Sequence, residues 1–379
     1  MHNKDRLIYG VCNFLIYMSI AIVYTQMIPF MKHIGYGSMQ QGTLLAVSAF
    51  VAMTGQLFFG YLCDRYQRMR IFFMIAYLGY LFSAVAMMRN EQAVFFYHLL
   101  TIGLSGGLVR VLMGMNETWM LEADRAHYGV LRAAGALGLS IGSLLIGYLI
   151  TISTYQFLSY VLLMMAGICL ILLWFCKDIK KEQSSFDKED LKEMIKDHRY
   201  QLLIIILFLI YMIGTIDQYA VVEKLLSIGG DTKDVGWKWG IQSLSEIPVF
   251  FVGNWLIKKI QAKRLLQFAI FMYGIKFFLY AFFQTPLFLV FSALLQVATL
   301  PLIMLSSKFL IQAVTDGQVA NSAQMFAMAI FMGGSAFVTP LLTSFLMLAF
   351  GYDLTLYAAS VFCVLPFILT FCLKIPKDA

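Results

Sequence analysis

Charged residues are scarce in this sequence. Only 13% of its 379 residues are Asp, Glu, Lys or Arg, whereas 60% are hydrophobic. About a quarter of the residues in a typical soluble domain are charged, so this composition excludes a soluble domain. It indicates a chain that is embedded in a membrane.

The motifs of enzymatic and ATP-driven chemistry are also missing. The five histidines are scattered without the HExxH spacing of zinc hydrolases, and no GxxxxGK[ST] phosphate-binding loop is present. The six cysteines lie in apolar runs or at their edges, where no disulfide framework is expected. The sequence therefore predicts neither an enzyme nor an ATP-driven pump, and it predicts no metal, no cofactor and no nucleic-acid partner.

Long apolar runs take the place of these motifs. About twenty apolar residues form a helix that crosses a ~30 Å hydrocarbon core, and backbone exposed to lipid must satisfy its own hydrogen bonds. The runs predict an all-α integral membrane protein with twelve transmembrane helices. The expected spans are residues 7–31, 40–62, 71–88, 93–120, 130–152, 155–176, 201–222, 235–257, 265–284, 286–310, 318–348 and 353–373.

Basic residues between the runs set the expected orientation. With the N-terminus inside, the inner side receives Lys4, Arg6, Arg65, Arg68, Arg70, Arg125, the seven bases of 177–199, Lys258, Lys259, Lys263, Arg264, Lys374 and Lys377. The outer side receives only Lys32, Arg89, Lys224, Lys233 and Lys238. This asymmetry predicts a multi-pass protein of the plasma (cytoplasmic) membrane with both termini in the cytoplasm. It also accounts for the net charge of +7 without nucleic-acid binding.

A polar segment near the middle of the chain divides the runs six and six. We expect an N-terminal half (1–176), a cytoplasmic linker (177–200) and a C-terminal half (201–379). Two similar stretches support this division: GYLCDRYQRMR at 60–70 follows the second run, and NWLIKKIQAKR at 254–264 follows the eighth. Such duplication is typical of secondary transporters, whose halves move about a central site. The predicted fold is therefore two pseudo-symmetric six-helix halves.

The first of these stretches resembles the loop 2–3 signature of the Major Facilitator Superfamily. It matches at Gly60, Leu62, Asp64, Arg65, Arg68 and Arg70, and it departs at Gln67, where the family usually has glycine. The resemblance implies a transporter that works by alternating access. Glycine allows close helix approach, and the charges can pair between inner helix ends. We therefore expect a gating role for Gly60, Asp64, Arg65 and Arg68.

Other positions resemble lactose-permease-like oligosaccharide/proton symporters and the related phenylpropionate-permease-like group. YGVLRAAG at 128–135 has the pattern with which that group opens its fifth span, and this implies that Arg132 contacts the substrate or the coupling acid. IDQY at 216–219 is similar to the Asp-Gln of that group's seventh span, and SEIP at 245–248 to the acid of its eighth. Lys276 stands where its ninth span holds a base.

The chain also departs from that group. Its tenth span reads LLQVATLP at 294–301, with only Gln296 and Thr299 where the symporters place a His and a Glu for proton coupling. Leu139 stands where galactoside binders present a Trp. The coupling carboxylate is therefore expected elsewhere, and galactoside specificity is not expected.

Ionisable residues inside the apolar runs point to the same region of the chain. Each buried charge costs a few kcal/mol, so such residues are usually paired or functional. The predicted substrate-binding residues are Asn116, Glu117, Arg132, Asp217, Gln218, Glu246 and Lys276. The alternative for each charged residue is an ion pair that only holds helices together.

The coupling acid is expected among Glu246, Glu117 and Asp217. Arg110 lies seven residues before Glu117 on one helix face, so it is expected to hold Glu117 ionised. Lys276 is expected to do the same for Asp217. Glu246 has no base within a helical turn in the sequence, and it is therefore the first candidate for the proton carrier.

The predicted function is proton-coupled symport of a small polar solute by a monomer in the lipid bilayer. A sugar or oligosaccharide is the first candidate for the solute, followed by a nucleoside or an aromatic acid. The alternative is a proton-driven exporter of amphipathic compounds, whose site would be mostly apolar with one or two acids. Ionisable residues in both halves favour the polar solute.

Overall fold

The computed structural model describes residues 3–124, 127–176, 178, 196–315 and 320–375. These ranges contain helices and no strand, as the need to satisfy backbone hydrogen bonds inside lipid requires. The α-helices are α1 (Asn3–His33), α2 (Ser38–Tyr66), α3 (Met69–Arg89), α4 (Phe95–Ala123), α5 (Tyr128–Ile152), α6 (Tyr155–Phe175), α8 (His198–Ser227), α9 (Thr232–Ile260), α10 (Ala262–Phe282), α11 (Pro286–Ser292), α12 (Leu300–Val314), α13 (Ala320–Met328), α14 (Ser335–Phe362) and α15 (Val364–Cys372). A 3-10 helix, η2 (Ala293–Ala298), joins α11 to α12, and a π-helix, η3 (Ala329–Gly334), joins α13 to α14.

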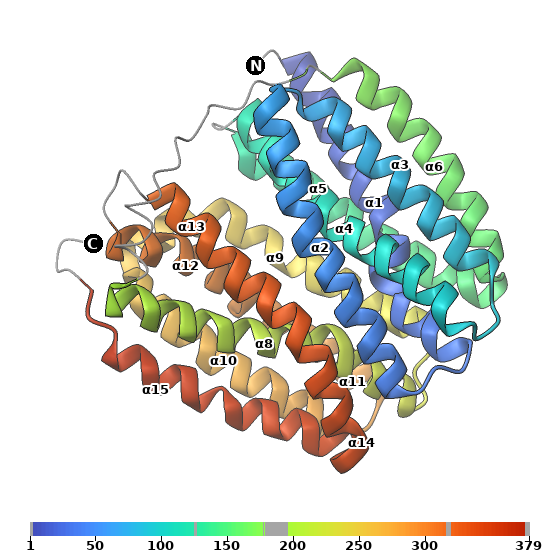
Figure 1. Ribbon diagram of the computed structural model, residues 1–379. Helices are drawn as coiled ribbons and strands as arrows, with labels where there is room; N and C mark the ends of the chain where they lie inside the picture. Colours follow the sequence, from blue (N-terminus) through green and yellow to red (C-terminus); the bar gives the residue numbers. More distant parts are fainter. Residues whose placement is uncertain (1–2, 125–126, 177, 179–195, 316–319, 376–379) are drawn as a thin grey trace.

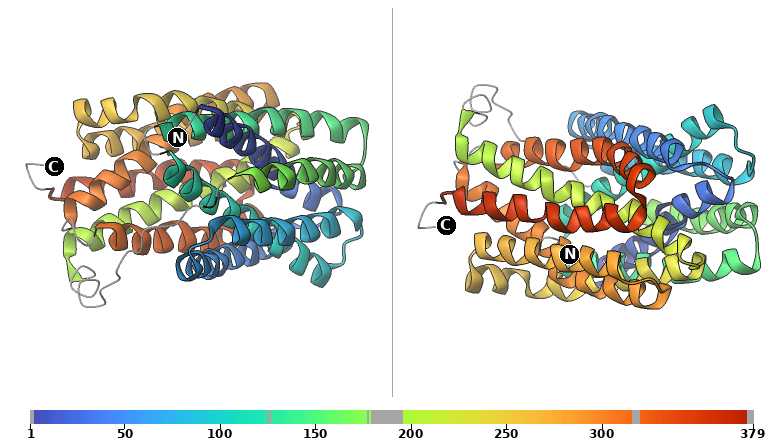
Figure 2. Two further views of the ribbon diagram at one scale, coloured as in Figure 1. Left: turned by 90° about the horizontal axis from the view of Figure 1, so that it is seen from above. Right: turned by 90° about the horizontal axis from the view of Figure 1, so that it is seen from below.

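The helices form two groups in space. Helices α1 to α6 make up the first group, and helices α8 to α15 make up the second group (Figure 1). In both views of Figure 2 the helices run in roughly the same direction, as the spans of one bilayer do. Most of the predicted linker, 177–200, falls outside the described residues.

Within the described part of the chain, ten segments are long and apolar enough to cross a membrane. The longest of them, Phe326–Cys372, has 47 residues, which is about twice the length of one crossing. Inside it the helix is interrupted at Gly351, whose φ of 78° suits only glycine well. Helix α9 is absent from the ten because side chains such as Gln242 and Glu246 make it more polar. The count of twelve spans therefore stays a prediction.

Each of the two similar stretches contains a glutamine with a positive φ angle. Gln67 (φ 53°) and Gln261 (φ 46°) are the non-glycine residues with positive φ in the described part of the chain, and 194 residues separate them. Positive φ disfavours residues with a Cβ, so its occurrence at equivalent places in the two stretches agrees with an internal repeat, although the ψ angles differ (36° and 132°). The Gln67 side chain donates to the Asp64 carbonyl at 2.7 Å, which holds the turn without the family's glycine.

Contacts of the first stretch tie it to the end of α6. The Arg70 guanidinium donates to the carbonyls of Trp174 and Cys176, both at 3.1 Å. Asp178 accepts from the backbone nitrogens of Met69 (2.9 Å) and Arg70 (3.0 Å). These bonds fix the α2–α3 turn within the first group.

The prediction that Gly60 permits close helix approach is wrong. No atom of a neighbour lies within 4 Å of the position that a Cβ would take there. The closest approaches lie at other glycines, on helices that the sequence alone did not bring together.

The two groups meet most closely at the end of the bundle opposite to the termini. A Cβ on Gly147 of α5 would lie 2.6 Å from the Thr232 carbonyl, and one on Gly236 of α9 would lie 2.6 Å from the Ser143 carbonyl. The Thr232 hydroxyl donates to the Gly147 carbonyl at 3.2 Å. Backbone therefore packs on backbone where α5 crosses α9.

A second contact between the groups joins α1 and α2 to α8 at the same end. The Tyr219 hydroxyl donates to the Ser38 carbonyl at 2.8 Å, and Lys32 forms an ion pair of 3.5 Å with Glu223. At the end that carries both termini, the ribbons of α2 and α13 diverge (Figure 1). The groups are therefore closed against each other at the opposite end.

We expect Gly138→Ala to destabilise the first group, because the new Cβ would overlap the Phe14 carbonyl of α1. Overpacking of this kind costs roughly 1–3 kcal/mol. The measurement is the apparent melting temperature of the purified protein in detergent, which should fall. Gly167→Ala on α6 is the matched control, since no atom lies within 4 Å of its Cβ position. Equal melting temperatures for the two variants would contradict the prediction.

Candidate functional site

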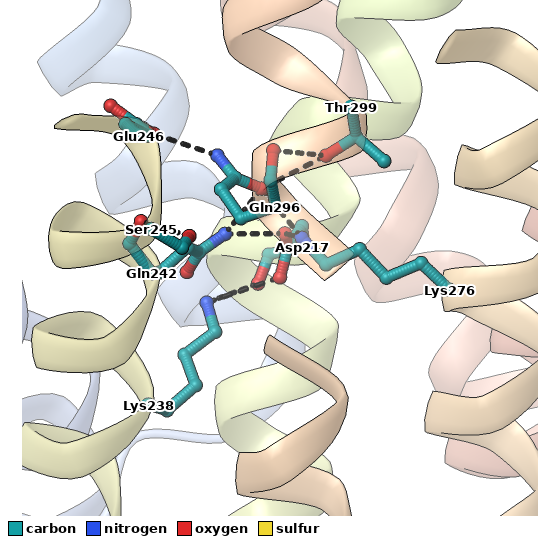
Figure 3. Close-up of polar contacts among 8 residues, drawn as sticks. All are labelled: Asp217, Lys238, Gln242, Ser245, Glu246, Lys276, Gln296 and Thr299. Atoms are coloured by element: carbon teal, nitrogen blue, oxygen red, sulfur yellow. Dashed lines mark hydrogen bonds and ion pairs between the residues drawn. The ribbon is translucent and has the colours of Figure 1, made fainter. Parts of the chain in front are cut away.

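Asp217 lies at the centre of a buried polar cluster in the second group (Figure 3). Its carboxylate is 2% exposed on α8 and lies between two ammonium groups. Lys276 Nζ of α10 is 2.6 Å from Oδ2, and Lys238 Nζ of α9 is 3.1 Å from Oδ1. Both lysines are fully buried. In a medium of low dielectric constant these charges stabilise one another, so the cluster holds Asp217 ionised. The structure thus contains the predicted pair of Asp217 and Lys276.

Lys238 is buried inside a helix, although the sequence counts it with the bases between the apolar runs. Helix α9 begins at Thr232, so Lys238 lies nearly two turns inside the helix and faces Asp217. Its ammonium also lies 3.7 Å from the centre of the Trp239 ring, which meets Tyr24 of α1 edge-on at 4.9 Å. The second lysine of the cluster therefore lies next to the first group.

Gln296 connects this cluster to Glu246. Its Oε1 accepts from Lys276 (2.7 Å), Gln242 (3.0 Å) and Thr299 (3.2 Å), and its Nε2 donates to Glu246 Oε1 at 2.9 Å. Flipping this amide would lose the bonds from the Lys276 ammonium and the Gln242 NH2 group, neither of which can accept a hydrogen bond. Oε1 of Glu246 must therefore act as an acceptor, which leaves Oε2 as the oxygen that can carry a proton.

Glu246 has no ion pair in the part of the chain that the structure describes. It is partly exposed on α9, and its one hydrogen bond comes from the neutral amide of Gln296. The charged groups that act on it are Arg132 of α5, Lys276 of α10 and Glu117 of α4. This setting agrees with the sequence, in which Glu246 has no base nearby.

Glu117 pairs with Arg132, and the predicted pairing with Arg110 is wrong. Arg132 Nε lies 3.0 Å from Glu117 Oε1. Two helical turns separate Arg110 from Glu117, a rise of about 10 Å, whereas α5 brings Arg132 directly alongside. The Arg132 guanidinium also lies over the rings of Tyr17 (5.4 Å) and Phe250 (4.9 Å), and Phe250 belongs to the second group.

Arg110 reaches from the first group to the second. Its Nη2 lies 3.4 Å from Oε1 of Gln218 on α8, and no carboxylate of the described residues lies within ion-pair distance. Tyr24 is near enough to interact electrostatically with four charged residues from both groups, namely Arg110, Glu246, Asp217 and Arg132. The predicted site residues thus gather where α1, α4 and α5 meet α8 and α9.

Asn116 is the predicted site residue whose contacts lie inside the first group. It is 1% exposed, and its amide donates to Asn13, whose own amide donates to the Leu131 carbonyl. These bonds join α4, α1 and α5. A contact of Asn116 with substrate stays a prediction.

A second polar cluster lies at the end opposite to the termini. Lys224 is fully buried rather than placed in a loop as predicted, and it lies 2.7 Å from Asp353. It also donates to the Ala281 carbonyl at 2.6 Å. Glu223 pairs with Lys32 and accepts from the Tyr352 hydroxyl at 3.3 Å. The sequence missed this cluster because both charges follow the seventh apolar run directly.

Comparisons with known proteins agree with the fold. A model of the MFS_1 like family matches residues 7–352. A crystal structure of a mutant of the nucleoside transporter NupG has a TM-score of 0.86 at 13% identity, covering 97% of this chain and 99% of that one. A second NupG structure has a TM-score of 0.81 at 12% identity, with 98% and 99% covered.

The human organic anion transporter MFSD10 is a third similar structure. Its TM-score is 0.67 at 13% identity, and the match covers 97% of this chain and all of that one. No curated protein sequence is significantly similar to this chain. At identities this low, the structural similarity shows the fold alone. Together with the family match, this fold indicates a transporter rather than an enzyme.

We expect Asp217→Asn to destabilise the protein strongly, because it strands two buried lysines. Loss of one partner from a buried ion pair costs about 3–5 kcal/mol. Adding Lys276→Met should recover part of the loss, since one buried charge is then removed. The apparent melting temperatures of the two variants test this order. Glu91→Gln is the control, because its pair with the exposed His33 contributes little. A double variant that is less stable than the single one would contradict the cluster's role.

Proposed function

The chain belongs to the MFS_1 like family of the Major Facilitator Superfamily, and on this basis we propose that it is a proton-coupled symporter of a small polar solute. Membership makes it a multi-pass membrane protein with the fold of secondary transporters. The observation that carries the proposal is the setting of Glu246. Among the described residues it is an acid without an ion pair, next to the cluster in which two lysines share Asp217, and at the junction of the two groups.

Alternating access would use the two groups as the moving halves, 1–176 and 201–379. The groups touch backbone to backbone at one end, at Gly147 and Gly236, whereas α2 and α13 diverge at the other. The excess of basic residues assigns the diverging end to the cytoplasm. On this assignment both termini are cytoplasmic, and the structure represents the state that is closed to the outside.

Proton coupling is assigned to Glu246 by comparison with the other acids. Asp217 forms ion pairs with two lysines, and Glu117 forms one with Arg132. Of the three acids, Glu246 alone breaks no ion pair when it gains a proton, because its hydrogen bond comes from a neutral amide. Protonation on Oε2 would remove an uncompensated charge before the site is carried across the membrane.

The solute is expected to contact groups from both sides of the junction. Arg132 comes from the first group, and Gln218 and Lys276 come from the second. Sugars, nucleosides and aromatic acids all present several hydrogen-bonding atoms to such a site. The NupG structures add weight to a nucleoside within this set. An exporter of amphipathic compounds is less well supported, since seven charged side chains converge here.

Gating is assigned to the α2–α3 turn. Asp64, Arg65 and Arg68 lie at the diverging end, where closure of the groups would bring them towards the second group. Arg65 at present donates to the Tyr61 hydroxyl at 2.8 Å, a local bond that costs little to break. Gly60 contributes no close helix contact in this state.

We expect Glu246→Gln to abolish uphill accumulation driven by a pH gradient while counterflow exchange persists. Glutamine imitates the protonated acid and keeps the acceptor oxygen that faces Gln296, so the site should still reorient. The measurement is uptake of radiolabelled uridine and a sugar panel into proteoliposomes, with and without a gradient. Glu91→Gln serves as the control. Undiminished accumulation in Glu246→Gln would transfer the role to Glu117 or Asp217.

We expect Arg132→Lys to lower the transport rate at least about tenfold, close to the loss in Arg132→Ala. Lysine keeps the charge but lacks the planar guanidinium that lies over Tyr17 and Phe250 and the Nε–H group that contacts Glu117. Initial rates in proteoliposomes provide the test. A lysine variant with full activity would reduce Arg132 to a generic positive charge.

A further inference from the structure

Arg110 is the one cation of the central site that has no acid. Lys238 and Lys276 share Asp217, and Arg132 has Glu117. The guanidinium of Arg110 touches only the neutral Gln218 among the described residues, at 3.4 Å. A guanidinium has five N–H donors, so most of its capacity is free to bind a ligand.

The central charges do not balance. The cations are Arg110, Arg132, Lys238 and Lys276, and the acids are Glu117, Asp217 and Glu246. The site therefore carries one positive charge in excess when all groups are ionised, and two when Glu246 is protonated. An uncompensated charge inside a membrane protein is unfavourable, and functional sites are where such charges persist.

We propose that the transported solute is a monoanion whose carboxylate binds Arg110. This inference rests on the proposed function and narrows its solute class to an acid. An arginine presents two parallel N–H groups that match the two oxygens of a carboxylate. A neutral sugar or nucleoside offers no such match.

Neighbouring donors complete the anion site. Gln218 turns its Oε1 to Arg110, which leaves its amide nitrogen without a partner in the described part of the chain. The Tyr24 hydroxyl likewise makes no hydrogen bond to a described residue, and it lies in electrostatic contact with Arg110. The three side chains offer hydrogen-bond donors and bring no carboxylate of their own, so an anion would satisfy the donors and also compensate the charge of Arg110.

The charge balance of the cycle favours an anion as well. When Glu246 takes up a proton and Arg110 binds a monoanion, the loaded site has the same net charge as the empty, deprotonated site. With a neutral solute the loaded site would carry one extra positive charge. A carrier whose empty and loaded forms have equal buried charge meets a similar electrostatic barrier in both directions of reorientation.

Ligand-induced thermal stabilisation of the purified protein tests the site directly. The probes are matched pairs: glucose and glucuronate, benzyl alcohol and benzoate, uracil and orotate. We expect at least one carboxylate to raise the apparent melting temperature of the wild type, and its neutral partner to leave it unchanged. The shift should vanish in Arg110→Gln. Arg110→Lys, which keeps the charge, should need at least about tenfold more ligand.

Arg89→Gln is the matched control, because Arg89 lies away from the central site, at the end of α3 and over the Tyr160 ring. It should keep the full shift. The proposal is overturned if no carboxylate stabilises the wild type, if only neutral probes do, or if the shift survives in Arg110→Gln. If Arg110→Gln does not fold, Arg110→Lys decides the question. The proposal is overturned if this variant needs no more carboxylate than the wild type for the same rise in melting temperature.

An electrical measurement separates this inference from proton coupling. A monoanion that enters with one proton carries no net current into proteoliposomes, whereas a neutral solute with a proton carries positive current inward. Uptake of a neutral solute accompanied by inward positive current would support proton symport and refute the anion site. A carboxylate shift that depends on Arg110, without accumulation in a pH gradient, would keep the anion site and refute the coupling.

Discussion

A buried charge needs a compensating charge, and this requirement organises the interior of the protein. Asp217 draws lysines from α9 and α10 into full burial, and these contacts hold three helices in register. Breaking such a cluster leaves an uncompensated ion, which is far more costly than losing an exposed pair. The cluster also fixes Gln296, whose amide donates a hydrogen bond to Glu246.

The helical architecture followed from composition because a bilayer allows few solutions. Apolar runs of sufficient length must be helices, and their ends were placed within a few residues of most observed helices. Errors arose where charge was equated with solvent. The pattern of basic residues assigns Lys224 and Lys238 to the outer side, between apolar runs. Both lie inside helices, with acids from other helices beside them. Sequence reveals that a charge is present, but only the fold reveals which distant carboxylate makes its burial possible.

The candidate site shows the same limit. The Asp217–Lys276 pair could be predicted, because unpaired charges deep in spans require partners and few are available. The partner of Glu117 could not, since helix crossing decides between Arg110 and Arg132. The sequence marked Gln296 only as a departure from the symporters, and nothing in it predicted the hydrogen bonds that this neutral amide makes. Its importance comes from its place in η2, where it accepts from three donors and donates to Glu246.

The glycine contacts between α5 and α9 have a mechanical consequence. Where Gly147 and Gly236 meet, backbone lies against backbone, so this part of the interface can separate without withdrawing a side chain, whereas further along the same helices Leu144 packs on Gly240. Separation at this seam loses dispersion contacts and a few hydrogen bonds that water can replace. The contact at Gly147 and Gly236 can therefore be tight when the groups are closed and still separate with little rearrangement.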